Sequence, residues 1–488
     1  MVKWRARASG TAFFDRTTEI ADIRGALTSG RSELRIVYGR RGAGKSTLFE
    51  HVFAGTHHFS YTCTPRVFAL QLADMERAIE DYAPGVLVGH LKTFDDFLSV
   101  LSRLAARTPR KPFIAVIDEL PYLAKEDKGV LGDLQRWFNR ERRGGVKKMK
   151  LFLLGSMVSW MEEQALSDTA ALKSVRTGQL AVHPLSYLHA AGFYPTWSAV
   201  DRIRAFSIWG GLPGVLSEIN KRKTFWTNVE TTTLTRGAKL YDEPDWLKYT
   251  DLRAEPLYSS IVRSIASGKR RPSDIAAEVM PAGSRSQIQP YLEKLRETQI
   301  VERRAPLLSK DERPRSSLYY VSDPFLAYWY RFVSPERSLL DRGMVARPRK
   351  RVMEGLDKYV SEDAFEVVSR AYLWEALAAK RLPRALEFDR VGSWWTGSGA
   401  DPDEADVVAY AGRELVLIGE CKWSNQPADE GDLRGLDKIV RDFPAELAPS
   451  PTLWRALFSR NGFSDELRRL ATRRSERVLL VEPADLYW

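Results

Sequence analysis

A glycine-rich segment at residues 39–46 has the residue types and the spacing that bind phosphate. Its sequence, Gly-Arg-Arg-Gly-Ala-Gly-Lys-Ser, fits the pattern G-x-x-x-x-G-K-[S/T]. The glycines let the backbone curl so that its N–H groups point at phosphate oxygens, and a following helix adds partial positive charge at its N-terminus. The alternative, a plain glycine-rich turn, is disfavoured by the strand and the helix expected on either side.

The residue types of this segment assign a role to each reactive side chain. We expect Lys45 to reach the β- and γ-phosphates of a nucleoside triphosphate, and the hydroxyl of Ser46 to bind Mg²⁺. The residues expected to contact the nucleotide are Gly39, Arg40, Arg41, Gly42, Ala43, Gly44, Lys45, Ser46, Thr47 and Ser156.

Two adjacent carboxylates, Asp118 and Glu119, end an apolar segment. We expect Asp118 to hold the Mg²⁺ and Glu119 to polarise the attacking water, because hydrolysis needs a base within hydrogen-bond reach. A solvated helix-capping pair is the alternative. Ser156 ends the next apolar segment, where its hydroxyl would sense the γ-phosphate. Arg176 is our candidate for stabilising the transition state, and a surface arginine is the alternative there.

A second set of candidate catalytic residues lies late in the chain. Asp406 heads one apolar segment and Glu420 ends the next, so a hairpin would bring Asp406, Glu420 and Lys422 side by side. Two carboxylates there can hold Mg²⁺, and a lysine beside them can activate water for phosphodiester cleavage. Cys421 points to the opposite face and is expected to pack. Since this spacing alone is weak, a structural ion pair between Lys422 and Glu420 is the alternative.

The elements that must position the phosphate site form the pattern of a parallel sheet with crossover helices. Strands are expected at 34–38, 113–117 and 151–154, each ending in a turn or a polar residue, which is where an open α/β sheet places its ligand. From 184 to 242 the pattern is helical, with a sharp break at 209–214. We interpret this part as a small helical lid.

A compact unit is expected between residues 257 and 333. Its elements are three helices and two strands, at 257–267, 273–279, 284–298, 300–306 and 317–321. Three short helices followed by a hairpin outline a winged helix-turn-helix. A basic connector follows, and the last part of the chain reads as a helix, two strands, a further helix and a final strand at 478–481.

Basic residues of this unit stand where a reader of nucleic acid needs them. They precede the second helix, begin the third and occupy the charged loop between the strands, as Lys269, Arg270, Arg271, Arg285, Arg313 and Arg315. Cationic side chains at these places could neutralise phosphates, and the third helix could enter a major groove, so duplex DNA is the expected partner. A winged helix that binds protein is the alternative.

Several short motifs resemble the archaeal-type ATPases of the AAA+/STAND group. Those motifs are Phe13-Phe14-Asp15-Arg16 with Glu19-Ile20, Arg40-Arg41, Asp118-Glu119, Gly155-Ser156, Gly210-Gly211-Leu212-Pro213, and the stretch from Tyr319 to Phe325. Where that family typically continues with Phe-Trp, this sequence has Tyr328-Trp329. The resemblance spans residues 13–488 and implies an ATP-hydrolysing core.

The late carboxylates lie in a region that resembles the C-terminal domain often fused to these ATPases. That domain is similar to the PD-(D/E)xK nuclease fold, in which a glutamate from the first helix can join the metal site. Glu366 is the matching residue here, and it would bind Mg²⁺ together with Asp406 and Glu420. An inert relic of the fold is the alternative, because a retained set of carboxylates does not prove the chemistry.

Pattern and resemblance together predict an α/β multidomain protein. The fold class is a P-loop NTPase parallel sheet with a helical lid, a winged helix-turn-helix and a C-terminal α/β restriction-endonuclease-like domain. The expected domains are a P-loop ATPase core at 1–183, a helical lid at 184–250, a winged helix-turn-helix at 251–335, a basic linker at 336–355 and a nuclease-like domain at 356–488.

Composition limits the classes of protein this chain can belong to. The 488 residues carry 74 Lys and Arg against 63 Asp and Glu, a net charge of +11, which favours polyanion partners. Two cysteines cannot build a disulfide framework, and their number fits a reducing compartment. No stretch is apolar enough for a membrane span or a signal peptide, so we expect no membrane partner and a cytoplasmic location.

The first functional hypothesis is an ATP-driven switch, with ATP and Mg²⁺ as cofactors, that processes or binds DNA. The second is a regulator in which ATP occupancy sets an assembly state, while an inactive nuclease-like domain binds DNA or protein. A helicase-like motor is disfavoured because one nucleotide core is recognisable, although a homo-oligomeric ring would restore that reading. The sequence does not distinguish ATP from GTP as the preferred nucleotide.

Overall fold

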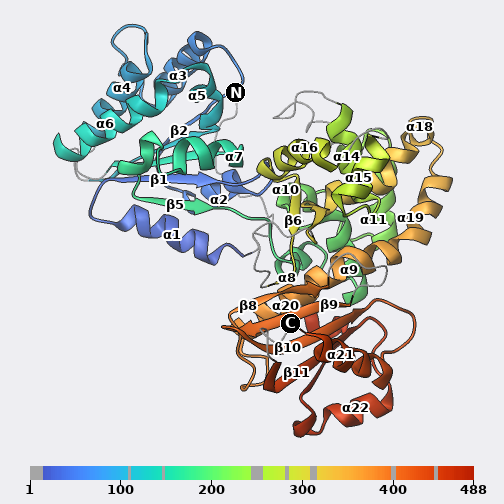
Figure 1. The fold of residues 1–488 in the computed structure, drawn as a ribbon. Helices are drawn as coiled ribbons and strands as arrows, with labels where there is room; N and C mark the ends of the chain where they lie inside the picture. Colours follow the sequence, from blue (N-terminus) through green and yellow to red (C-terminus); the bar gives the residue numbers. More distant parts are fainter. Residues whose placement is uncertain are drawn as a thin grey trace. The chain divides into compact units, whose positions relative to one another are not determined.

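A computed structural model describes residues 15–107, 111–144, 149–242, 256–280, 285–307, 316–396, 403–443 and 449–488. The chain divides into two compact units, which are described separately: residues 1–184 with 212–214, and residues 185–211 with 215–488. Figure 1 shows the elements of both units along the chain. Within the described ranges, no helix has both the length and the apolar character needed to cross a membrane.

The first unit is built on a parallel sheet of five strands. The strands are β1 (Glu33–Tyr38), β2 (Phe59–Thr62), β3 (Phe113–Asp118), β4 (Met149–Gly155) and β5 (Gly178–Ala181). Their order is β2-β3-β4-β1-β5, and each neighbouring pair is parallel. The three strands expected from the apolar segments are confirmed as β1, β3 and β4. Because all five run the same way, their carboxyl ends meet at one edge.

Helices cover both faces of this sheet. They are α1 (Thr17–Thr28), α2 (Lys45–Val52), α3 (Phe68–Tyr82), α4 (Phe94–Ala106), α5 (Leu120–Glu126), α6 (Val130–Gly144) and α7 (Val158–Trp160). Thr93 and Asp96 form a reciprocal capping box at the start of α4. In Figure 1 the helices α3 to α6 lie on one side of the sheet and α1 lies on the other.

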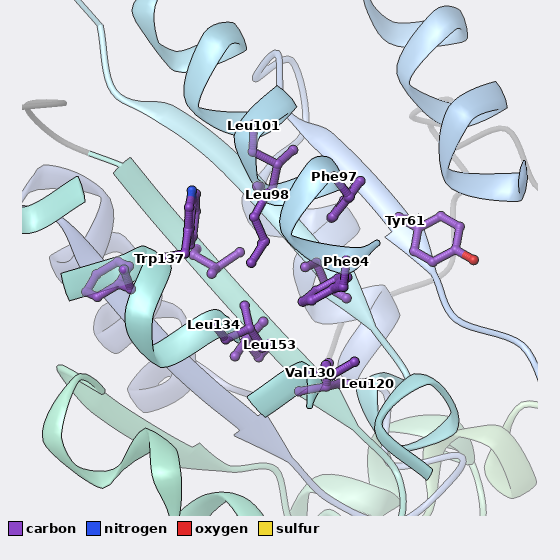
Figure 2. Close-up of a cluster of buried hydrophobic side chains, with 14 of the residues drawn as sticks. Tyr61, Phe94, Phe97, Leu98, Leu101, Leu120, Val130, Leu134, Trp137 and Leu153 are labelled. Atoms are coloured by element: carbon purple, nitrogen blue, oxygen red, sulfur yellow. The ribbon is translucent and has the colours of Figure 1, made fainter. Parts of the chain in front are cut away.

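The core of the first unit lies between the sheet and helices α3 to α6. Figure 2 shows large apolar side chains of α4 and α6 directed at the strands, and those of both helices are almost fully buried. The indole N–H of Trp137 on α6 donates to the hydroxyl of Ser102 on α4 at 2.9 Å, so this buried donor is satisfied. Dense packing of this kind holds the carboxyl ends of the strands in fixed positions.

The second unit begins with short helices, as expected for residues 184–242. The helices of this part of the chain are α8 (Tyr187–Ala190), α9 (Ala199–Trp209), α10 (Pro213–Leu216), α11 (Phe225–Val229) and α12 (Lys239–Asp242), and the first two residues of α10 belong to the first unit. The hydroxyl of Ser198 caps α9 by accepting from the amide of Asp201. The expected break falls at Gly210, whose φ of 62° lies in the region that glycine tolerates best.

Three helices and a two-stranded sheet follow, in the expected order. The elements are α14 (Pro256–Ala266), α15 (Pro272–Val279), α16 (Arg285–Glu297), β6 (Val301–Arg304) and β7 (Leu318–Val321), and the strands are antiparallel. Arg313, Arg315 and the side chain of Arg285 lie outside the described residues. Where we expected a basic connector, the chain forms helices, after α17 (Pro324–Tyr328), as α18 (Arg337–Leu340) and α19 (Ala346–Tyr359).

The last part of the chain forms a mixed five-stranded sheet with helices. Its elements are α20 (Phe365–Ala378), β8 (Arg390–Trp395), β9 (Glu404–Ala411), β10 (Glu414–Lys422), α21 (Glu430–Asp442), β11 (Pro449–Ser459), α22 (Asp465–Ala471) and β12 (Val478–Val481). The strand order is β12-β11-β10-β9-β8. The expected hairpin is confirmed as antiparallel β9 and β10, whereas β8 and β11 were not expected. β10 pairs with β11 in parallel.

Candidate functional site: a phosphate loop and a carboxylate–lysine cluster

The glycine-rich segment runs from the carboxyl end of β1 to the start of α2 and curls around a lysine. Gly42 and Gly44 have φ of 82° and 87°, which side chains rarely adopt. The ammonium of Lys45 donates to the carbonyls of Gly39 at 2.6 Å and Arg40 at 3.2 Å. A side-chain carbon at Gly39 would lie 2.2 Å from the carbonyl oxygen of Val182, so this position accepts only glycine.

Lys45, Ser46 and Asp118 are brought together at the ends of β1 and β3, as the sequence predicts. The hydroxyl of Ser46 donates to Asp118 Oδ2 at 3.3 Å. Burial lowers the pKa of Lys45, although the charges of Glu119 and Asp118 oppose this. Burial also raises the pKa of Asp118, with Glu119 adding to the effect. A hydroxyl and a carboxylate side by side are oxygen donors of the kind that Mg²⁺ prefers, so this pair fits the ion.

Glu119 stands at the N-terminus of α5 in a strained conformation, with a φ of 54°. Its Oε2 accepts hydrogen bonds from the hydroxyl of Ser156 at 2.7 Å and from the amide of Ser156 at 3.1 Å. Because Ser156 directly follows β4 and Glu119 directly follows β3, the two neighbouring strands place a base and a polar sensor in contact. The helix-capping alternative for Glu119 does not describe this pair, since no side-chain cap is formed.

The remaining expected residues of the phosphate site lie at its margins. Arg41 is exposed, and its charge lowers the pKa of Lys45, so it lies close to that ammonium. Ala43 is fully buried, whereas Thr47 is exposed on the first turn of α2. Arg176 donates to the carbonyl of Leu166 at 2.6 Å and to that of Ala165 at 3.3 Å. Its role in the transition state stays a prediction.

Arg16 is a residue whose role sequence reasoning missed. It is 5% exposed, and its guanidinium donates to the carbonyl of Ala43 in the phosphate loop at 3.0 Å and to the carbonyl of His183 at 2.7 Å. It also pairs with Glu19 at 2.8 Å. The signal that could have found it is the arginine and glutamate three residues apart in the first motif. Arg16 therefore ties the loop to the segment that follows β5.

Residues 212–214 also contact the phosphate loop. The amide of Gly214 donates to the carbonyl of Gly42 at 3.0 Å. A side-chain carbon at Gly214 would lie 3.1 Å from the Cα of Gly42, so the two backbones touch. Gly214 is needed because the two backbone segments approach so closely.

Asp406, Glu420 and Lys422 occupy the same end of the β9–β10 hairpin, where Val407 is opposite Gly419. Asp406 Oδ2 accepts a hydrogen bond from the amide of Cys421 at 2.8 Å. Lys422 pairs with Glu420 at 2.7 Å and with Asp432 of α21 at 3.2 Å. The hairpin thus assembles the predicted side chains.

Glu366 reaches the same cluster from α20. Arg370, one turn later, donates to Glu366 Oε2 at 3.2 Å and to the carbonyl of Asp406 at 2.7 Å. Burial raises the pKa of Glu366, and the charge of Asp406 raises it further. Burial likewise raises the pKa of Asp406, with Glu420 and Glu404 adding repulsion. Carboxylates that repel one another in this way are stabilised by a cation.

The set proposed for metal, Glu366, Asp406 and Glu420, is nevertheless not preassembled. Among the residues that the structure describes, no group of three or more His, Cys, Asp or Glu side chains is arranged to hold a metal ion. Each carboxylate is engaged elsewhere, since Glu420 pairs with Lys422, Glu366 pairs with Arg370 and Asp406 accepts from a backbone amide. Metal binding there requires these side chains to exchange partners.

Comparisons with known proteins match the first part of the chain to an ATPase family and a later part to a family of unknown function. Residues 13–219 match the family described as an ATPase domain predominantly from Archaea, and residues 329–433 match a family of archaeal and bacterial proteins of unknown function. An uncharacterised protein of Methanocaldococcus jannaschii is 26% identical over 433 residues, which cover 88% of this chain and 90% of that protein.

Two solved structures align with this chain over most of their own lengths. A Walker-type ATPase of Pyrococcus abyssi has a TM-score of 0.50 and 18% identity, covering 65% of this chain and 96% of its own. The ORC2 protein of Aeropyrum pernix, in ADPNP and ADP complexes, has a TM-score of 0.43 and 13% identity, covering 70% and 98%. The parallel sheet, the phosphate loop and the match over residues 13–219 together support a P-loop ATPase domain similar to those of Archaea.

Proposed function

We propose that this protein is an ATP-driven switch that acts on nucleic acid. The observation that carries the proposal is the meeting of Lys45, Ser46, Asp118, Glu119 and Ser156 at the carboxyl ends of three parallel strands. Every group needed to bind and hydrolyse a Mg²⁺-bound triphosphate is present there in one place. ATP and Mg²⁺ are the proposed cofactors.

Each side chain of this site has a proposed task in hydrolysis. Lys45 exchanges its loop carbonyls for the β- and γ-phosphates, and Ser46 with Asp118 would hold the Mg²⁺, which supplies charge stabilisation. Glu119 orients the attacking water, and Ser156 fixes that carboxylate through two hydrogen bonds. Because Ser156 lies beside both the base and the expected γ-phosphate, it can report which phosphate is present.

Substitution of Lys45 tests the assignment directly. Lys45→Ala is expected to abolish ATP binding measured by calorimetry, because it removes the buried ammonium proposed to contact the β- and γ-phosphates. Lys128→Ala, an exposed lysine of the same unit, is the matched control and should bind ATP like the parent protein. Unaltered ATP affinity in Lys45→Ala would overturn the assignment of the phosphate loop.

We further propose that the cluster of Asp406, Glu420, Lys422 and Glu366 cleaves phosphodiesters in DNA with Mg²⁺. The gathering of like-charged, half-buried carboxylates around a lysine at one sheet edge supports this proposal, because such an arrangement is costly without a functional cation. The test is cleavage of supercoiled and linear DNA with Mg²⁺ or Mn²⁺, with and without ATP, in parent protein and in Asp406→Ala. Cleavage that survives in Asp406→Ala places the active site elsewhere.

A second candidate function is an ATP-switched regulator whose cluster is inactive. The double ion pair of Lys422 with Glu420 and Asp432 favours it, because this lysine is already neutralised by two carboxylates. Under this reading the same assay shows no cleavage while DNA is still retained in a gel shift.

We propose that helices α14 to α16 and strands β6 and β7 bind duplex DNA. We also propose that the protein is cytoplasmic and forms a homo-oligomer. Among the expected phosphate contacts, Arg270 is engaged within the protein, since its guanidinium donates to the carbonyl of Ile265 and lies 4.3 Å from the ring centre of Tyr320. Arg285→Ala should reduce the slope of log affinity against log salt by about one unit if that residue contacts a phosphate. An unchanged slope favours a protein partner.

A further inference from the structure

One carboxylate in the second unit, that of Asp357 on α19, collects donors from three separate parts of the chain. Arg204 of α9 donates to Asp357 Oδ1 through Nε at 3.1 Å and Nη2 at 2.8 Å. The indole N–H of Trp423 donates to the same oxygen at 3.2 Å, and Arg460 donates to Oδ2 at 2.8 Å. Both oxygens of this carboxylate are therefore engaged, and both bonds of Arg204 are charge-assisted.

Two of these donors flank Lys422, the lysine of the carboxylate–lysine cluster. Trp423 is the next residue along the chain, and the amide of Arg460 donates to the carbonyl of Lys422 at 2.9 Å. The Arg460 guanidinium also lies 5.1 Å from the ring centre of Trp423. Asp357 thus fixes the carboxyl end of β10 from outside the sheet, through a covalent neighbour and a hydrogen-bonded neighbour of Lys422.

The ring of Trp423 extends this link to α20. It is 7% exposed and packs edge-on against Phe365 at 5.0 Å, and Phe365 directly precedes Glu366. A shift of the indole would consequently move the backbone on both sides of the cluster, at Lys422 and at Glu366. Close packing transmits such displacements because the interior has little room to absorb them.

The third donor, Arg204, belongs to the helix that leads to the nucleotide site. Three residues beyond the end of α9 the chain reaches Leu212, and residues 212–214 contact the phosphate loop through the hydrogen bond from Gly214 to Gly42. Arg204 is 16% exposed and is held by Asp201 as well as by Asp357. A change at the loop can therefore reach Asp357 along a short, continuous piece of chain.

The charge of Asp357 suits this position. Burial acts to raise the pKa of its carboxyl, but the hydrogen bonds and charges of Arg204, Trp423 and Arg460 outweigh burial and lower that pKa. The side chain is thus ionised at neutral pH and balances two guanidinium groups that would otherwise repel each other. Loss of its charge removes the charge assistance of these hydrogen bonds and leaves the two guanidinium groups without a shared counter-ion.

We propose that Asp357 is a positioning residue that couples helix α9 to the carboxylate–lysine cluster, so that the nucleotide bound at the phosphate loop sets the placement of Lys422. The proposal rests on the proposed phosphodiesterase function of that cluster. It assigns Arg204 to the transmission of the nucleotide signal, and Trp423 with Arg460 to the placement of the lysine.

Three variants of the full chain separate these roles in the DNA cleavage assay. Asp357→Asn should lower cleavage about tenfold or more and remove its response to a non-hydrolysable ATP analogue, with ATPase activity retained. Arg204→Gln should keep basal cleavage but lose the response, and Asp357→Glu should restore part of both. Glu362→Gln is the matched control, because Glu362 is a comparably exposed acid that pairs with a different arginine, Arg331, at 2.9 Å. Parent-like cleavage and nucleotide response in Asp357→Asn would overturn the coupling.

Hydrogen exchange of the segment 420–424 tests the coupling without cleavage. Exchange there should change when the ATP analogue is added to the parent protein and should not change in Arg204→Gln. If the parent protein shows this change but cuts no DNA, the coupling stands and the phosphodiesterase proposal fails. If DNA is cut but amide hydrogen exchange at residues 420–424 is the same with and without the nucleotide, the coupling fails and the phosphodiesterase proposal stands.

Discussion

Removal of the Arg16 side chain is expected to weaken ATP binding although Arg16 is not part of the phosphate loop. Its guanidinium satisfies two carbonyls, one in the loop at Ala43 and one at His183 after β5. Arg16→Ala leaves both acceptors without this donor in a region where the arginine is 5% exposed. The loop then loses a restraint that holds it in the curled conformation needed for phosphate.

The size of the effect follows from the bond to Ala43. A hydrogen bond to a charged group contributes about 1.5–3 kcal/mol, which corresponds to roughly 10- to 150-fold in a binding constant if the loop carries the whole loss. We expect the dissociation constant for ATP to rise by that factor and KM to rise with it, while kcat changes less. Loss of the second bond, to His183, is expected to lower the stability of the unit by a similar amount.

Calorimetric titration with ATP, steady-state ATPase rates and thermal unfolding measure these effects together. Arg16→Lys keeps the charge but not the planar fork, in which Nη2 donates to both carbonyls while Nη1 donates to Glu19, so it should fall between Arg16→Ala and the parent protein. Arg24→Ala, an exposed arginine on the same helix, is the control and should change none of the three measurements. ATP binding by a folded Arg16→Ala protein at parent affinity would refute the reasoning.

Three further predictions concern the two sites. Glu119→Gln should bind ATP normally but hydrolyse it about 100-fold more slowly or worse, as measured by phosphate release, because the water loses its base. Gly39→Ala should destabilise the fold by about 1–3 kcal/mol in a denaturant titration, because the new carbon meets the backbone oxygen of Val182 at 2.2 Å. The raised pKa values of Glu366 and Asp406 mean that their ionisation, as pH rises through those values, costs stability that was present at lower pH. Mn²⁺ should therefore raise Tm more at about pH 8.5 than at about pH 6, and Asp406→Asn should lose that difference.

The phosphate site was predictable because its chemistry is local in sequence. Residues 39–46 lie within one turn between a strand and a helix, and Asp118 and Glu119 end a strand of six buried residues. Arg16 was not predictable in the same way, because its partner in the loop is 27 residues away and its other carbonyl is 167 residues away. Contacts at such separations depend on the tertiary fold.

We predicted a basic connector where the chain forms helix α19, because the basic residues are more conspicuous in the sequence than the few buried side chains on one face of the helix. Arg347, Arg349, Lys350 and Arg351 dominate its first turns, yet the spacing of its buried side chains is helical: Pro348, Val352, Leu356 and Tyr359. The strand β11 was missed for the opposite reason, since it begins with two prolines and lacks an alternating pattern in its first half. The mutual approach of Asp357, Trp423 and Arg460 left no trace in sequence at all.

Because residues 212–214 belong to the first unit, that unit is completed only after part of the second unit has been synthesised. The first unit is interrupted after Pro184, and its last piece emerges only after α9 has been synthesised. During translation, the hydrogen bond from the amide of Gly214 to the carbonyl of Gly42 can therefore form only after residue 214 has been synthesised. A fragment that stops at residue 184 lacks residues 212–214, which belong to the first unit. The ATPase domain should therefore be produced with its boundary beyond residue 214. Proteolytic cleavage between residues 185 and 211 should weaken the contact between Gly214 and the phosphate loop.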